Sequence, residues 1–352
     1  MKIAIDCRMM GMSGIGVFLE NILTHLVSDF SENTYVLIGK KEKLSCFYKY
    51  ANCQVIDVNI NIFSFKEIFL FPVRYINTCD VFYSPNFNIP GFINIPIYCT
   101  IHDVVFLDVD GLTNRIGRYI RKLMLWRAIF LSQKIFTVSQ FSKSRILYHF
   151  KTHKQIEIIY NAISEILKKQ LAYNSLSEKK EYIIYVGNIK PHKGLKTLLD
   201  AFKQLREKGV KEKLYIVGNA TNFRTVDTKI VELMESLSEE VVFTGYVSDI
   251  ELFNLIKNAS VLVQPSIYEG FGIPPLEALY LGTPVLVSDI PVFKELYASL
   301  NVKYFKVGDV DDLAIQLLSL LSSEQFIPSR EEILALYNYE KSAKKLLEDI
   351  LK

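Results

Sequence analysis

The sequence contains few cysteines, and their arrangement speaks against a disulfide-stapled protein. There are five among 352 residues, and all lie in the first third of the chain: Cys7, Cys46, Cys53, Cys79 and Cys99. The number is odd and no two of them form a C-x-x-C pair, so no disulfide framework is indicated. We therefore expect reduced, buried thiols, as in a cytoplasmic protein.

Long apolar runs and a strong charge bias are also missing, and no leader segment is expected. No apolar run reaches the length of a membrane span, and residues 1–6 become polar too early for a signal peptide. The 41 basic and 38 acidic residues leave a net charge of +3, without the clustering that nucleic-acid binding requires. These absences predict a cytoplasmic protein without a nucleic-acid partner.

The most informative stretch, residues 259–289, is expected to form a strand, a loop, a helix and a second strand. An apolar run at 261–263 is typical of a strand buried on both faces. Pro274 and Pro275 suit the first helical turn, and Gly282 is placed to end the helix. The helix start offers free N–H groups to an anion. Glu269 and Glu277 would be repelled by that anion, so we expect them to bind hydroxyl groups, as in a sugar joined to a nucleotide through diphosphate.

The N-terminal residues also predict a strand, a glycine loop and a helix, the opening of a doubly wound sheet. The strand covers residues 2–6 and the loop contains Gly14 and Gly16. The dinucleotide pattern G-x-G-x-x-G fails at Leu19, which counts against an NAD-dependent oxidoreductase. The loop either lets backbone N–H groups approach a donor phosphate or sugar, or forms a tight turn without a ligand.

The segment PSIYEGFGIPPLEAL resembles the E-x7-E motif of retaining glycosyltransferases with the GT-B fold, of the glycogen-synthase and mannosyltransferase type (family 4). The resemblance implies two Rossmann-like, doubly wound domains facing across a cleft. It places Glu269 near the reacting carbon of the donor sugar and Glu277 on the nucleotide ribose. It also places the intervening Gly270, Phe271, Gly272 and Ile273 at the donor. Without the resemblance, an acid in a surface loop and an acid on a solvated helix face would be the more common explanation of the two.

The resemblance assigns further residues to the site. His102, after the strand at 97–101, falls at the donor sugar, and a GIG loop like that of Gly14 and Gly16 recurs in the family. Lys193 matches the lysine that stabilises the leaving diphosphate, and Val247 lies where the family holds the nucleotide base. Asn188 stands where the family usually has arginine, so one positive charge is missing. Either Lys190 or His192 supplies part of it.

Residues 115–130 predict a basic amphipathic helix. Its apolar side is expected to contain Ile116, Tyr119, Ile120, Leu123, Trp126 and Phe130. The candidate membrane or acceptor residues on it are Arg115, Arg118, Arg121, Lys122, Trp126 and Arg127. Such a helix either seeks a membrane surface or packs its apolar stripe into the core. Arg127, towards the apolar side, suggests a contact with a lipid phosphate or an acceptor.

We expect domains at 1–165, joined by a returning helix at 338–352, and at 180–335, with a linker at 164–180. The resemblance implies transfer of a hexose such as mannose or rhamnose, with retention, to a saccharide or polyprenyl-linked acceptor in bacterial surface polysaccharide assembly. The protein would be cytoplasmic, peripheral on the inner face of the plasma membrane. No cofactor or metal is expected, and the D-x-D at 108–110 is interpreted as a solvated loop. A catalytically silent subunit and a sugar-nucleotide epimerase are the alternatives.

Overall fold

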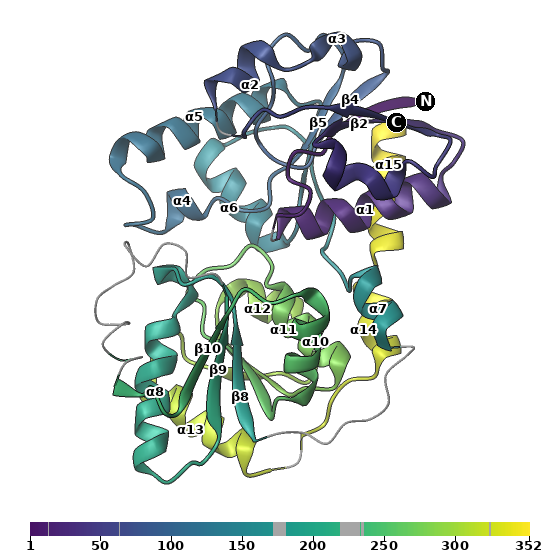
Figure 1. Ribbon diagram of the computed structural model, residues 1–352. Helices are drawn as coiled ribbons and strands as arrows, with labels where there is room; N and C mark the ends of the chain where they lie inside the picture. Colours follow the sequence, from purple (N-terminus) through teal and green to yellow (C-terminus); the bar gives the residue numbers. More distant parts are fainter. Residues whose placement is uncertain (13, 63, 172–180, 219–232, 234–235, 324) are drawn as a thin grey trace. The chain divides into compact units, whose positions relative to one another are not determined.

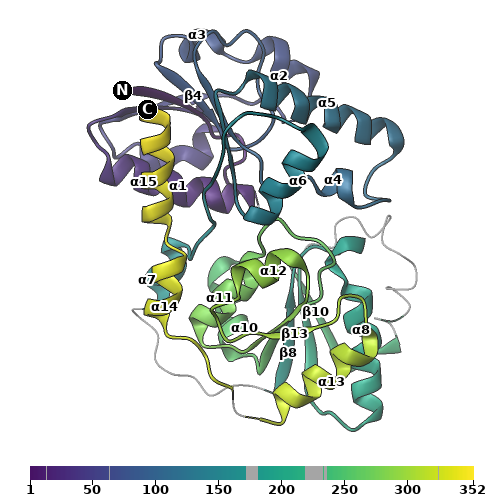
Figure 2. The same ribbon diagram turned by 180° about the vertical axis from the view of Figure 1, so that it is seen from behind.

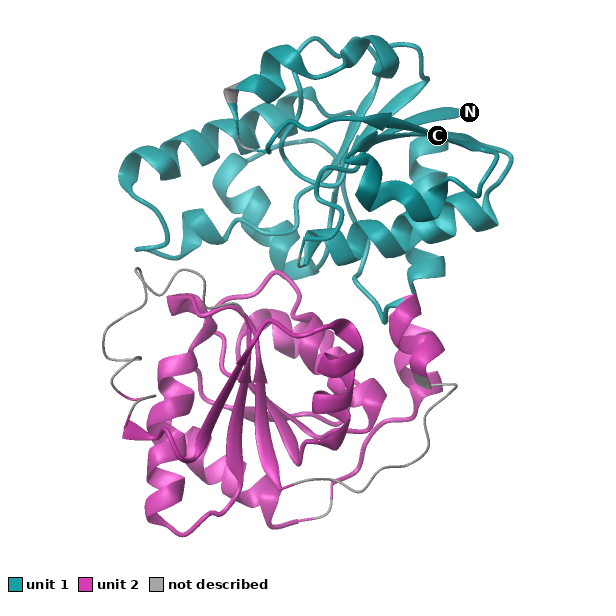
Figure 3. Ribbon diagram, viewed as in Figure 1, with its two compact units in different colours: residues 1–164, 338–352 teal, residues 165–337 magenta. Residues whose placement is uncertain are grey.

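The chain divides into two compact units, which Figure 3 shows in different colours. The structure is a computed structural model that describes residues 1–12, 14–62, 64–171, 181–218, 233, 236–323 and 325–352. Unit 1 comprises Met1–Ser164 and Asn338–Lys352, and unit 2 comprises Glu165–Tyr337. The expected linker begins with helix α7 (Glu165–Leu171), and its residues 172–180 lie outside the described part.

Unit 1 is built on a parallel sheet with the strand order β3-β2-β1-β4-β5-β6-β7. The strands are β1 (Lys2–Asp6), β2 (Thr34–Gly39), β3 (Cys53–Asp57), β4 (Val81–Ser84), β5 (Ile97–Thr100), β6 (Lys134–Thr137) and β7 (Ile156–Ile158). Their apolar runs are almost continuous because helices cover both faces of a parallel sheet. The strand order reverses between β1 and β4, which makes this pair the topological switch point of unit 1.

The helices of unit 1 come from both ends of the chain. They are α1 (Ile15–Asp29), the 3₁₀ helix η1 (Lys41–Phe47), α2 (Phe65–Leu70), α3 (Val73–Ile76), α4 (Val105–Asp108), α5 (Arg115–Leu131), α6 (Gln140–Phe150) and α15 (Tyr339–Leu351). Helices α1 and α15 lie side by side (Figures 1 and 2). Tyr339 is fully buried between them and donates a hydrogen bond of 3.3 Å to Asn161 Oδ1. The C-terminal helix therefore completes the core of unit 1.

Unit 2 has a second parallel sheet, with the order β10-β9-β8-β11-β12-β13. Its strands are β8 (Tyr182–Val186), β9 (Lys213–Val217), β10 (Val241–Gly245), β11 (Val261–Gln264), β12 (Val285–Ser288) and β13 (Lys303–Phe305). Its helices are α7, η2 (Pro191–Lys193), α8 (Leu195–Glu207), α10 (Asp249–Asn258), α11 (Ile273–Leu281), α12 (Pro291–Leu296), α13 (Val310–Leu321) and α14 (Arg330–Leu336). The order reverses between β8 and β11, so this pair is the switch point of unit 2.

Two Rossmann-like, doubly wound sheets were expected from the sequence, and this expectation is confirmed. Helices α8 and α13 pack together on one face of the second sheet, with α10 and α11 on the other (Figure 1). The predicted helix at 115–130 is also present, as α5. Strand β13 and the short helices α2, α3 and α4 were not predicted, because each is too short to show a periodic pattern.

Candidate active site

The site in unit 2 is built where two loops meet beyond the carboxyl ends of β8 and β11. The first loop joins β8 to α8 and carries Lys193; the second joins β11 to α11 and carries Glu269. The N–H of Ile267 donates a hydrogen bond of 2.9 Å to the carbonyl of His192, which ties the loops together. The position is the switch point of the sheet, where open α/β sheets bind their ligands.

Close packing of these loops requires glycine at position 194. Gly194 has a φ of +68°, in the left-handed region, and a Cβ there would lie 1.9 Å from the carbonyl oxygen of Pro265. Any side chain would therefore push the two loops apart. Glycine is needed here for the approach of one loop to the other, which brings Lys193 to the β11 loop.

Lys193 and Glu269 form an ion pair across the two loops. The ammonium nitrogen lies 2.7 Å from Oε1 and 2.8 Å from Oε2 of Glu269. The hydroxyl of Ser266 donates a further hydrogen bond of 2.8 Å to Oε1, and the amide of Gln264 approaches the same oxygen at 3.4 Å. Glu269 is buried, so these donors hold its carboxylate in one orientation. The sequence prediction did not include Ser266 or Gln264.

Two helices begin at this site: the first turn of α8 carries an N–H on every residue, whereas in α11 only Ile273 carries one before Pro274 and Pro275, which have none. Helix α8 follows Gly194 and α11 follows Gly272, and neither has a side-chain hydrogen bond at its N-terminus within the described residues. Neither has an acidic residue in its first turn. Free N–H groups and the positive end of the helix dipole attract anions. Together with Lys193 they provide donors that suit a diphosphate.

The loop at 188–192 contains three polar side chains of interest, and they differ in whether they carry a positive charge near pH 7. Asn188 is exposed and carries no charge. Burial, together with the neighbouring charge of Lys193, lowers the pKa of His192 to about 4. His192 is therefore neutral near pH 7, which leaves the exposed Lys190 as the cation that can replace the missing arginine. His192 Nδ1 is buried and has no hydrogen-bond partner among the described residues.

Glu277 lies on α11, one residue beyond its first turn, and its carboxyl group is buried. Burial, together with the negative charge of Asp249, raises its pKa to about 7. The surrounding protein therefore stabilises the ionised form poorly. Hydroxyl donors from a ligand would stabilise it, since hydrogen bonds to a carboxylate favour its charged form.

The other predicted donor residues of unit 2 have different surroundings. The ring of Phe271 is buried edge-on against Tyr337, 5.7 Å between centroids, so it packs the loop. The carbonyl of Gly272 accepts a hydrogen bond of 2.7 Å from Tyr297. Gly270 is buried, while Ile273 and Val247, the latter between β10 and α10, are half-buried.

In unit 1, His102 follows β5 and is fixed as a neutral imidazole. Its Nε2 lies 3.1 Å from the carbonyl of Pro85, and the ring meets Phe18 edge-on at 5.0 Å. Burial lowers the pKa of His102 to about 4. Because a carbonyl only accepts, Nε2 carries the proton and Nδ1 is left as a hydrogen-bond acceptor.

The glycine loop between β1 and α1 has one open and one crowded glycine. A Cβ at Gly14 would meet nothing within 4 Å, whereas one at Gly16 would lie 2.6 Å from the carbonyl of Met9. Gly16 is therefore required by the packing of its own loop, and Gly14 leaves space for a ligand. Ser13, between Met12 and Gly14 in this loop, lies outside the described residues.

Helix α5 exposes the side that the sequence predicted to be apolar. Ile116 is 71% exposed, Tyr119 70% and Phe130 65%, while Leu125, Ala128 and Ile129 pack into the core. The alternative in which the predicted stripe fills the core is therefore wrong. No helix within the described residues has the length and hydropathy needed to cross a membrane.

Three arginines of α5 are engaged within unit 1. Arg118 pairs with Asp110 at 2.6 Å and Arg121 bonds to Thr113 at 2.8 Å. Arg127 donates to the carbonyls of Ile89 and Pro90. The expected contact of Arg127 with a lipid phosphate or an acceptor is therefore replaced by a structural one. Trp126 is exposed and stacks on Phe130, and the remaining two basic residues, Arg115 and Lys122, are also exposed.

The expectation that the D-x-D at 108–110 is a solvated loop is wrong for Asp108, whereas the side chain of Asp110 is exposed as expected. The carboxylate of Asp108 is nearly buried and accepts from Arg145 Nε at 2.9 Å and from His149 at 2.7 Å. Asp110 forms an ion pair with Arg118. Across the described ranges, no group of three or more His, Cys, Asp or Glu side chains is placed to hold a metal ion.

The chain is similar in sequence to two O-antigen mannosyltransferases over part of its length. RfbU, an O-antigen chain mannosyltransferase of Salmonella typhimurium, is 34% identical over 203 residues, 56% of this chain and 53% of the relative. The O-antigen chain mannosyltransferase B of Escherichia coli is 28% identical over 265 residues, 70% of this chain and 66% of that protein. The alignments thus span between about half and two thirds of these relatives.

Solved structures match the fold over the full chain. Sucrose-phosphate synthase from Thermosynechococcus elongatus has a TM-score of 0.77 at 16% identity, covering 99% of this chain and 97% of that one. Anabaena HepE in complex with UDP and glucose has a TM-score of 0.75 at 17% identity, covering 99% of both chains. The sequence family described as "Glycosyl transferases group 1" matches residues 149–339, more than half of the chain. As the E-x7-E segment predicted, the protein belongs to the glycosyl transferases group 1 family.

Proposed function

We propose that this protein transfers a hexose, in the first place mannose, from a nucleotide-diphosphate sugar to a saccharide acceptor. The observation that carries the proposal is the pair of Lys193 and Glu269 at the switch point of unit 2, beside two helix N-termini. The pair combines a cation for phosphate with a buried carboxylate for hydroxyls. The O-antigen mannosyltransferases among the relatives support mannose, and the UDP and glucose bound to HepE support a nucleotide sugar.

In the proposed mechanism the donor diphosphate replaces Glu269 as the partner of Lys193. Lys193, together with the first N–H groups of α8 and the N–H of Ile273 at the positive end of α11, neutralises the charge that develops on the leaving diphosphate. Glu269 is then released to accept hydrogen bonds from the donor sugar, while Ser266 keeps its carboxylate in place. Such fixed groups act without reorganisation during the reaction.

The remaining donor contacts follow from the same chemistry. Glu277 accepts hydrogen bonds from the ribose hydroxyls, and His102 Nδ1 accepts one from the donor sugar. The configuration at the reacting carbon is retained, and the donor phosphate takes the proton of the acceptor hydroxyl. No metal is required, because the cation and the helix N-termini already oppose the phosphate charge.

The acceptor is proposed to be a lipid-linked saccharide reached at the inner surface of the plasma membrane. Exposed apolar residues and the exposed cations Arg115 and Lys122 on α5 support contact with an anionic bilayer. The product would then be part of a bacterial surface polysaccharide, as the names of the relatives suggest for those proteins.

A second candidate function is a catalytically silent subunit that binds a partner glycosyltransferase. The exposed Asn188, at the position where arginine was expected, favours it. The two functions differ in donor turnover. We expect the purified chain to release nucleoside diphosphate slowly from GDP-mannose or a UDP-hexose in the absence of acceptor.

The test combines binding with hydrolysis. The melting temperature is measured with UDP, GDP and dTDP, since a ligand that binds the native state raises it. Hydrolysis of the matching nucleotide sugar is then followed for the wild type and Glu269→Gln. Binding with hydrolysis that Glu269→Gln abolishes supports the enzyme. Binding without any hydrolysis supports the silent subunit, and no binding of any nucleotide overturns the transferase.

A further inference from the structure

A second apolar patch lies in unit 1, outside α5. It consists of Phe69 and Leu70 at the end of α2 and Phe92 in the loop after β4. Phe69 is 66% exposed, Leu70 64% and Phe92 69%, and the two phenylalanine rings lie 6.2 Å apart. Single exposed apolar residues are ordinary. Two large rings in contact, with a third exposed apolar residue next to one of them in sequence, form a patch that needs an explanation.

The backbone at Phe92 is held in a conformation that is unfavourable for a bulky residue. Its φ is +59°, one of two positive values outside glycine in the described residues. The carbonyl of Phe92 accepts from Asn77 at 3.1 Å, and the preceding N–H, of Gly91, donates to Ile68 at 3.1 Å. The fold therefore bears a backbone cost and leaves the ring in solvent. Packing within unit 1 does not account for a phenylalanine there.

The patch is structurally joined to α5. Arg127 of α5 donates to the carbonyls of Ile89 and Pro90, in the segment that leads to Phe92. Helices α2 and α5 are neighbours in both views (Figures 1 and 2). The aromatic pair and the exposed side of α5 thus belong to one part of unit 1, and Arg127 fixes them relative to each other.

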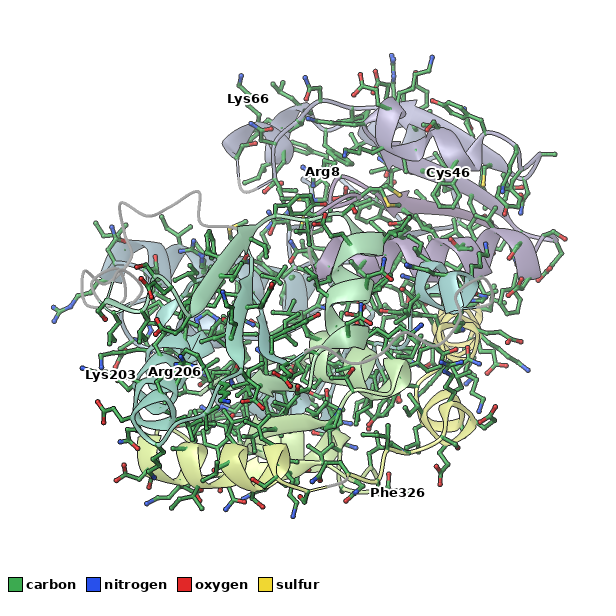
Figure 4. The ribbon with its side chains drawn as sticks, turned by 60° about the horizontal axis from the view of Figure 1, so that its bottom comes forward. Arg8, Cys46, Lys66, Lys203, Arg206 and Phe326 are labelled. Atoms are coloured by element: carbon green, nitrogen blue, oxygen red, sulfur yellow. The ribbon has the colours of Figure 1, made fainter. Side chains whose placement is uncertain are left out.

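The charges around the patch are basic. The acid of α2, Glu67, is buried in an ion pair with Arg8 at 2.9 Å, and α5 contains no acid. Lys66 on α2 is exposed; Figure 4 shows it projecting from the surface, with Arg8 inside the fold. Exposed aromatic rings beside lysine and arginine suit the interface of an anionic bilayer, where amphipathic elements insert their apolar side.

We infer that Phe69, Leu70 and Phe92 form a second membrane contact, beside α5, with the headgroup region of an anionic bilayer as its occupant. The inference rests on the membrane location in the proposed function and adds a second element to it. A single helix on a surface can roll about its axis. Two contacts that are fixed to each other set the orientation of unit 1 on the bilayer.

The experiment uses the full chain and its single tryptophan, Trp126 on α5, as the probe. Vesicles of phosphatidylcholine with and without phosphatidylglycerol are added, and tryptophan emission and vesicle co-flotation are measured. The test variant is Phe69→Ala/Phe92→Gly, because glycine removes the ring and accepts the positive φ. The matched control is Phe326→Ala in unit 2, which removes a phenylalanine that is also 69% exposed.

We expect anionic vesicles to shift the emission of Trp126 to shorter wavelength in the wild type. The partition coefficient of the double variant should fall at least about tenfold, the loss expected from two phenylalanine side chains no longer buried. Its melting temperature and its hydrolysis of the nucleotide sugar should not fall. Phe326→Ala should partition as the wild type does.

Three outcomes overturn the inference. Equal partition of the double variant and the wild type rejects the second contact alone. A dimer of the wild type that the double variant loses identifies a second copy as the occupant. A wild type that hydrolyses the donor but ignores all vesicles rejects the membrane location, and with it this inference, while the transferase itself stands. Absence of donor hydrolysis is a separate failure, of the proposed activity.

Discussion

Lys193 holds both carboxylate oxygens of Glu269, at 2.7 Å and 2.8 Å, across the junction of the β8–α8 and β11–α11 loops. Each residue compensates the charge of the other in a largely buried position. The diphosphate that Lys193 is proposed to bind must therefore displace a carboxylate. This exchange couples donor binding to the release of Glu269.

The first prediction concerns the energy of this pair. Lys193→Met leaves Glu269 buried without its cation, and Glu269→Gln leaves Lys193 without its anion. Each single change should destabilise unit 2, whereas the double variant should lose less than the sum. We expect a coupling energy of about 1–3 kcal/mol, typical of interacting neighbours. Urea unfolding of the four proteins measures it, and strict additivity would contradict a direct pair.

The second prediction separates the roles of the two glutamates. Glu269→Gln should lower sugar transfer about 100-fold or more, since it removes a charge that acts at the reacting centre. Glu277→Gln should chiefly raise the KM for the donor. Steady-state kinetics of both variants distinguishes the two, with Glu331→Gln, an exposed acid of α14, as the control. Turnover at the wild-type rate in the Glu269 variant, or an unchanged donor KM in the Glu277 variant, would refute the division of roles.

The third prediction is a pH dependence of donor binding. The pKa of Glu277 is about 7 because the group is buried, and ribose hydroxyls favour the ionised form. Nucleotide affinity should therefore rise as the pH increases from 6 to 8. The nucleotide phosphate also titrates in this range, so calorimetric titrations of the wild type are compared with those of Glu277→Gln. The part that belongs to Glu277 should vanish in the variant.

The pH dependence of protein stability has the opposite sign to that of donor affinity for the same group, Glu277. In the unfolded chain the carboxyl group of Glu277 has its usual pKa of 4.5 and loses its proton above that pH. In the folded protein the group keeps its proton up to a pH of about 7. The contribution of Glu277 to stability is thus present at low pH and lost as the pH rises towards 7. Glu277→Gln should raise the melting temperature more at pH 8 than at pH 5.

The fourth prediction compares two glycines that share a left-handed backbone. Gly194 has a φ of +68° and a Cβ site 1.9 Å from Pro265, whereas Gly209 has a φ of +86° and open space around it. Gly209→Ala should cost only the backbone term, about 1–2 kcal/mol. Gly194→Ala should lower the melting temperature further and abolish nucleotide binding. Equal melting temperatures for the two variants would mean that the loops can separate freely.

Much of the fold could be predicted from the sequence because buried parallel strands appear in it as short apolar runs. The strands around 182–186 and 261–264 and the helix after Pro274 could be placed in this way. The pairing of Lys193 with Glu269 could not, because 76 residues separate them and only the strand order makes them neighbours. The sequence showed two loops, and the switch point brought them together.

The wrong predictions concern side chains whose contacts depend on the tertiary structure. Asp108 was assigned to solvent from its place in a polar loop, but Arg145 and His149 of α6 surround it. For α5, periodicity identified two sides but not which of them faces the core. Leu125, Ala128 and Ile129 are enough to anchor the helix, and the larger apolar residues stay outside. No local pattern carries this information.

The return of residues 338–352 to unit 1 has a consequence for synthesis of the protein. Tyr339, Leu346 and Ile350 of α15 are buried in that unit, and Asn338 forms a β-bridge with Ile163. The ribosome delivers all of Glu165–Tyr337 before this helix exists. Until α15 is translated, the side of α1 that packs against it stays uncovered in unit 1. The whole sequence of unit 2 is therefore available for folding before that of unit 1.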